Sequence, residues 1–261
     1  MPPRLLRPSL LPLLLCACFA RPPATVALPP ETASVLLTAL DGEALFTLAS
    51  GLKPVSEGFW QRWIDVTAPD LGPVATTRAA LQPWRTDELW ADVHVFHQVH
   101  DGKRAALAYV VDRRALSALL RREQAFFAPH GLLPDTHPAE VMAVVERMPP
   151  LDRHRGQGLL FGYPRHAIEF FVAAAAEGDG KPSPRRFVQI PTFASPTGRF
   201  VYAVAADAEE HADDVTLRER AAVQLARYRE LRSGSQLDEP AVLQDLVAAL
   251  RTEFAPPTGT Q

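Results

Sequence analysis

An Asp-Gly pair, Asp101–Gly102, lies between two apolar segments that cover residues 91–100 and 104–112. Asp-Gly between apolar runs is typical of a type I′ turn, which needs positive φ at both central residues. The two segments therefore predict the strands of an antiparallel hairpin near residues 92–111. This constrains the fold more than any other stretch, because it places two strands beside each other without any tertiary information.

The rest of the chain mixes strands and helices. A turn-forming cluster at residues 194–198 joins two apolar runs and predicts a second hairpin near 186–206, and the glycine-flanked run near 157–162 predicts a short strand. A short helix is expected from Ser56 onward, carrying Phe59, Trp60 and Trp63. Apolar residues at helical spacing predict helices in residues 31–48, 113–132, 137–148, 165–177, 213–231 and 239–254. We predict an α+β fold with amphipathic helices on one face of a mostly antiparallel sheet.

The amino-terminal segment predicts export. Basic residues at Arg4 and Arg7 precede an apolar run and then a proline-rich break, which is the order of a secretory signal. Leu15–Cys18 resembles a bacterial lipobox, in which Cys18 would be lipidated, although Cys16 is unusual at its position. The competing cut is ordinary signal-peptidase cleavage after Ala20 or Ala27, so both alternatives stay open.

The expected domain organisation follows from this signal. Residues 1–20 form the signal segment and 21–30 a proline-rich tether, before a single α+β domain over 31–255 and a tail over 256–261. An alternative division makes residues 31–90 a separate helical subdomain at the amino-terminal end of that domain. Both cysteines, Cys16 and Cys18, lie inside the signal, so the mature domain has no disulfide framework.

Three histidines, His94, His97 and His100, suggest a metal site, but the geometry of a strand argues against one. Side chains alternate along a strand, so His97 faces away from the other two. His94 and His100 are separated by about 20 Å at ~3.3 Å per residue. Zinc–nitrogen bonds are only ~2.0–2.1 Å long, so these three residues cannot share one ion, and we expect neither a metal nor a cofactor.

Catalytic motifs are missing from the sequence: it contains no H-E-x-x-H, G-x-S-x-G or S-x-x-K. What remains is a polar cluster that could receive an anion at the helix after Pro164. Its members are His154, Arg155, Tyr163, Arg165, His166 and Arg185. The competing interpretation is a solvated basic rim.

These observations favour an exported, envelope-associated bacterial protein that is noncatalytic and binds a protein or envelope partner or supports envelope structure. One alternative is an exported hydrolase with its site near residues 154–166. Another is a small-ligand binding domain near Trp60, Trp63, Trp84 and Trp90. A net charge of -3 gives no electrostatic case for nucleic acid, and membrane association is expected only through a lipid anchor.

Overall fold

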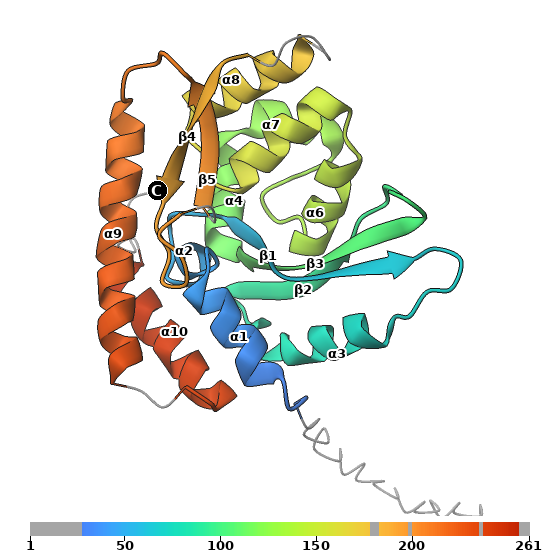
Figure 1. Cartoon of the computed structure of the whole chain (residues 1–261), viewed down its shortest axis with the longest axis vertical. Coiled ribbons are helices and arrows are strands. Elements are labelled where there is room, and N and C mark those ends of the chain that lie inside the picture. The colour runs from blue at the N-terminus through green and yellow to red at the C-terminus, as the bar shows by residue number, and fades with distance from the viewer. Residues whose placement is uncertain (1–27, 178–182, 198–199, 235–236, 256–261) are drawn as a thin grey trace, which may run out of the picture.

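The fold is mixed α+β, with antiparallel sheets of three and two strands surrounded by helices in a computed structural model (Figure 1). The structure describes residues 28–177, 183–197, 200–234 and 237–255. The strands are β1 (Val55–Asp65), β2 (Leu89–Val95), β3 (Lys103–Asp112), β4 (Arg185–Ile190) and β5 (Phe200–Ala205). The helices are α1 (Thr32–Asp41), α2 (Leu45–Leu48), α3 (Gly72–Ala80), α4 (Arg113–Arg122), α5 (Gln124–Phe127), α6 (Pro138–Arg147), α7 (Pro150–Leu160), α8 (Arg165–Ala176), α9 (Ala212–Ser233) and α10 (Pro240–Phe254), with short 3-10 turns η1 (Gln82–Trp84) and η2 (Ala128–His130).

Both predicted hairpins are confirmed. β2 and β3 pair antiparallel, and the turn between them has φ of 48° at Asp101 and 72° at Gly102, as a type I′ turn requires. The second hairpin is the two-stranded sheet of β4 and β5, in which Val188 pairs with Tyr202. Local sequence was sufficient for both, because each hairpin is formed by neighbours in the chain.

The expected short helix after Ser56 is wrong, because this segment forms strand β1. β1 pairs antiparallel with β3 and gives the three-stranded sheet the order β1-β3-β2. The register shifts between Glu57 and Gln61, and Gly58 within that irregularity has φ of 85°. The pairing partner lies about fifty residues away in the chain, so local periodicity could not reveal it.

Helices cover both faces of this sheet, which corrects the expectation that they lie on one face (Figure 1). Alternate residues of β3 enter two separate cores: Ala108 and Val110 pack with α1, α2 and α10, whereas Tyr109 and Val111 pack with α4, α6 and α7. A strand buried on both sides reads as a continuous apolar run, and residues 105–111 do so.

The strand predicted near residues 157–162 is also wrong, because residues up to Leu160 belong to helix α7. Pro150 occupies the first turn of α7, where its missing N–H carries no penalty. Glycine weakens a helix interior, and this misled the prediction. The glycines of α7 instead permit close packing: a Cβ at Gly156 would lie 3.0 Å from Val145 Cγ1 of α6, and one at Gly158 would lie 2.8 Å from Ile168 Cγ1 of α8.

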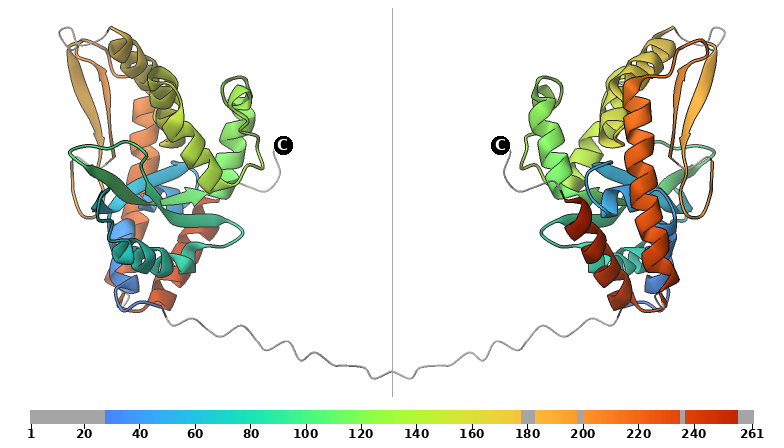
Figure 2. Two further views of the ribbon diagram at one scale, coloured as in Figure 1. Left: turned by 90° about the vertical axis from the view of Figure 1, so that its right-hand side faces the viewer. Right: turned by 90° about the vertical axis from the view of Figure 1, so that its left-hand side faces the viewer.

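The two carboxyl-terminal helices close the larger core. α9 runs along one side of the molecule beside β4 and β5, and α10 folds back under the three-stranded sheet (Figures 1 and 2). His211 caps α9 by accepting a hydrogen bond from the Asp213 N–H through Nδ1. Arg251 of α10 reaches the end of β3, where its Nη1 donates to Asp112 Oδ2 at 3.0 Å.

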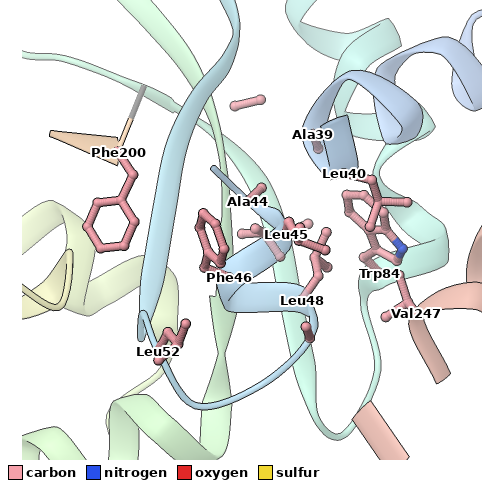
Figure 3. Close-up of a cluster of buried hydrophobic side chains, with 14 of the residues drawn as sticks. Ala39, Leu40, Ala44, Leu45, Phe46, Leu48, Leu52, Trp84, Phe200 and Val247 are labelled. Atoms are coloured by element: carbon pink, nitrogen blue, oxygen red, sulfur yellow. The ribbon is translucent and has the colours of Figure 1, made fainter. Parts of the chain in front are cut away.

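The first helices contribute to that same core. Figure 3 shows Leu40 and Phe46, from α1 and α2, in one cluster with Trp84 and with Val247 of α10. Within residues 31–90, therefore, α1 and α2 pack against the carboxyl-terminal helices and β1 joins the sheet of β3.

The described residues do not include the expected signal segment (1–20), the lipobox at 15–18 with Cys18, most of the tether (21–30) or the tail (256–261). Any cleavage position in these segments therefore also lies outside the described residues. Among the residues that are described, no helix is both long enough and apolar enough to cross a bilayer.

Candidate functional site

An apolar cavity of about 400 Å³ lies between the α7–α8 helix pair and the β4–β5 hairpin. Its walls come from four consecutive elements of the chain, and Figure 2 shows the hairpin alongside these helices. It is lined by His154, Gln157, Gly158, Phe161, Tyr163, Ala167, Ile168, Phe171, Phe187, Val201, Tyr202 and Ala203. Ligand sites in proteins typically measure ~300–1,000 Å³ and have mostly apolar walls, so this cavity has the size and chemistry of a small-ligand site.

Two phenylalanines leave a large part of their rings exposed at this cavity. Phe171 of α8 is 40% exposed and Phe187 of β4 is 58% exposed. Isolated exposed apolar residues are common, but two aromatic rings bordering one apolar cavity form a contiguous patch. Such a patch is the expected entrance for an apolar ligand.

Three polar side chains interrupt the apolar wall, besides Tyr202, whose hydroxyl donates to Asp214. His154 of α7 lies edge-on to Phe171, with ring centroids 5.2 Å apart, and burial lowers its pKa, helped by the charge of Arg153. Gln157 lies one helical turn further along α7. The rings of Tyr163 and Tyr202 pack with their centroids 5.6 Å apart. Burial of Tyr163 raises its pKa well above the usual range, and the negative charges of Glu43 and Glu57 add to this effect. The wall therefore presents a neutral imidazole, an amide and a neutral phenol at neutral pH.

The predicted anion-binding cluster is only partly brought together. His154 and Tyr163 line the cavity, whereas Arg165 turns away and donates two 2.7 Å hydrogen bonds from Nη2 to the Glu123 carboxylate. His166 lies beside Asp214 instead. Arg155 is half-buried on α7, and Arg185 donates from Nε to the Ser183 carbonyl.

Sequence reasoning missed the apolar residues that dominate this cavity. Ile168 and Phe171 are three residues apart on α8 and share one face, a spacing visible in the sequence. The exposed Phe187 gave no signal of its own. Its place opposite α8 depends on the packing of the hairpin against the helices, which no local pattern encodes.

A second group of ionisable residues lies around the start of β1. Lys53 is fully buried and its Nζ lies 2.9 Å from Glu43 Oε2 and 4.3 Å from the centroid of the Phe200 ring. The nearby Glu57 has its pKa raised to about 7 by burial and by the charge of Glu43, with Lys53 acting in the opposite direction. A carboxyl group with this pKa has the acidity suited to proton transfer at neutral pH.

The space beside Glu57 is too small for a substrate. Glu57 and His94 line a cavity of only about 10 Å³, which is the size of a single water molecule. Burial lowers the pKa of His94, and its Nε2 has no hydrogen-bond partner among the described residues. The arrangement is therefore a buried polar cluster without room for a reaction.

The three histidines of the first hairpin contact three different partners. His94 packs edge-on against Phe96, and His97 pairs through Nδ1 with Glu146 of α6. His100 lies beside the Trp63 ring at the far end of the hairpin. The tryptophans predicted to form a ligand site lie in different environments: Trp84 is in the core, whereas Trp63 is about half exposed.

Comparisons of this chain with protein-family models, curated proteins and solved structures find no match.

Proposed function

We propose that this protein is an exported, noncatalytic binding protein that holds a small, predominantly apolar ligand in the cavity between α7–α8 and β4–β5. The observation that carries the proposal is the combination of an apolar cavity of about 400 Å³ with two exposed phenylalanines, Phe171 and Phe187, at its border. Burial of apolar surface stabilises a complex by roughly 25 cal/mol per Å², so such a wall favours a ligand of matching character.

The polar groups of the wall indicate the rest of the ligand's chemistry. His154, Gln157 and Tyr163 are uncharged donors and acceptors, and the arginines expected at this place face elsewhere. The proposed ligand is therefore an apolar body with a neutral polar group, rather than an anion.

A fluorescence titration with N-phenyl-1-naphthylamine, a neutral apolar dye, tests this function. We expect saturable binding of one dye per chain, and we expect Val201→Trp, which fills the cavity from β5, to abolish it. Phe187→Ser should weaken binding at the border. Val223→Ser is the matched control, because Val223 is 59% exposed on α9, away from the cavity. Equal binding by the parent and Val201→Trp would refute the proposal.

Export and envelope association are the second half of the proposal, supported by the basic, apolar and proline-rich order of residues 1–27. Protein recovered from the bacterial envelope should lack Met1 by intact-mass analysis. If Cys18 is lipidated, Cys18→Ser should move the protein to the soluble fraction. Unprocessed protein retained in the cytoplasm would contradict export.

The alternative of an exported hydrolase near residues 154–166 has less support. Arg165 and His166 contact different acidic residues, Glu123 and Asp214, and so do not converge on one position with His154. A partner-binding role remains compatible with the cavity if the partner inserts an apolar side chain there, and competition between that partner and the dye would reveal it.

A further inference from the structure

A second cluster lies where the amino termini of α8 and α9 approach each other. His166 of α8, His211 at the start of α9 and Asp213 in its first turn each offer one ligand atom, and these atoms all lie within 4.8 Å of one another. The two imidazole rings are nearly parallel, with centroids 4.2 Å apart and an interplanar angle of 22°. None of these residues contributes to the lining of the apolar cavity.

A buried carboxylate lies beside His166. Asp214 is 1% exposed, and its Oδ1 accepts a 2.7 Å hydrogen bond from the Tyr202 hydroxyl and lies 3.2 Å from His166 Nε2. Metal-binding histidines commonly donate their other ring N–H to a neighbouring carboxylate, which fixes the tautomer and increases ligand basicity. A small rotation of the His166 ring would turn its Nε2–H onto Asp214, and Nδ1 would then be the ligand atom.

Unpaired polar atoms point to a missing partner at the same place. Within the described part of the chain, neither ring nitrogen of His166 makes a hydrogen bond, and Oδ2 of the buried Asp214 has no partner either. Buried polar groups are nearly always hydrogen-bonded, and an uncompensated buried carboxylate is costly. A nearby cation would offset the negative charge of Asp213 and Asp214.

We propose that His166, His211 and Asp213 bind a divalent transition-metal ion of the zinc class, with Asp214 and Tyr202 orienting His166. Two imidazoles and a carboxylate are typical zinc ligands, whereas calcium and magnesium prefer oxygen ligands alone. Three protein ligands leave a fourth position for water or a ligand group. The site revises the expectation from sequence that the protein binds no metal.

Binding requires a local adjustment at His211. The ligand atoms around one zinc ion lie about 3–3.5 Å apart, because each bond is only ~2.0–2.2 Å long. The half-exposed ring of His211 must therefore rotate out of its stacked position, which releases the cap hydrogen bond from the Asp213 N–H to Nδ1. The exposure of His211 gives it the freedom to rotate, whereas Asp214 beside His166 is buried.

Calorimetric titration of the purified, chelator-treated protein with zinc chloride tests the site. We expect one equivalent to bind and expect His166→Gln and His211→Asn each to weaken binding by about tenfold or more. Asparagine is a good helix cap, so His211→Asn removes the imidazole without leaving the end of α9 uncapped. Tyr202→Phe should also weaken binding by roughly tenfold, because loss of an outer partner typically reduces metal affinity ~10–100-fold.

His137→Asn is the matched control. His137 is another exposed histidine that caps a helix, α6, through Nδ1. The His137→Asn variant should bind zinc with the affinity of the parent. Circular dichroism checks that each variant is folded. If a histidine variant fails to fold, Tyr202→Phe still tests the site, because it leaves both imidazoles in place. The proposal is overturned if the parent binds no stoichiometric zinc, if the folded His166 and His211 variants bind like the parent, or if His137→Asn loses affinity equally.

Discussion

Gly158 of α7 and Ile168 of α8 lie in direct contact, so that a Cβ at position 158 would stand 2.8 Å from Ile168 Cγ1. This contact brings the two helices together, and both residues also line the proposed ligand cavity. Ile168 is buried and β-branched, so its side chain has little freedom to move away. A glycine that is unfavourable for an isolated helix is thus required by the tertiary structure.

Gly158→Ala should destabilise the protein by about 1–3 kcal/mol, because overpacking opposes the gain of ~0.5–1 kcal/mol that alanine normally gives inside a helix. Urea unfolding measures the change. Gly234→Ala is the control: Gly234 has φ of -96° and the nearest atom to an added Cβ is 4.0 Å away. A more stable Gly158→Ala protein would show that α7 and α8 can separate at no cost.

Asp112→Ala should be among the most destabilising single changes, by about 3–5 kcal/mol, because it leaves the Arg251 guanidinium buried without Asp112 as its partner. Asp112 also caps α4 by accepting from the Ala115 N–H at 2.9 Å. Asp112→Asn can still cap α4 and should therefore lose less stability than Asp112→Ala. Denaturant unfolding distinguishes the variants.

Arg227→Ala provides the comparison for that ion pair. Its partners Glu230 and Glu253 are exposed, and surface pairs contribute only about 0–1 kcal/mol. A loss in Arg227→Ala equal to that in Asp112→Ala would mean that burial of the Asp112–Arg251 pair is unimportant.

Glu57 should make stability fall as the pH rises from about 4.5 to about 7. Its folded-state pKa of about 7 lies above the ordinary value of 4.5, so the folded protein retains a proton that the unfolded chain loses over this interval. The stabilisation is complete below the unfolded pKa and lost above the folded one. Its size is at most about 3–4 kcal/mol, at ~1.4 kcal/mol per pKa unit.

Glu57→Gln should therefore be more stable than the parent at pH 8 and should lose the parent's pH dependence between 4.5 and 7. Thermal unfolding over this pH range gives the comparison. An unchanged slope in Glu57→Gln would assign the dependence to another group.

Gly102→Val should destabilise the first hairpin by about 1 kcal/mol or more, since a β-branched residue is strained at φ of 72°. Hydrogen exchange at the paired amides of β2 and β3 should increase together with the loss of global stability. A variant as stable as the parent would indicate that the turn can adopt another type.

The sequence by itself determined the features that depend on neighbours in the chain. Asp101–Gly102 specifies a hairpin turn, and Pro138 and Pro240 begin helices where they are expected, because turn and cap chemistry act within a few residues. Antiparallel strands mixed with amphipathic helices were likewise enough to identify the α+β class.

Tertiary structure alone decided how the elements meet. β1 is a strand because β3 supplies its hydrogen bonds, and α7 tolerates Gly158 because α8 packs closely there. The cavity bounded by Phe171 and Phe187 depends on how the β4–β5 hairpin packs against α7 and α8, and the approach of His166 to His211 joins segments far apart in the chain. The physical reason is the same in each case: burial and hydrogen bonding to distant partners outweigh a local preference of about 1 kcal/mol.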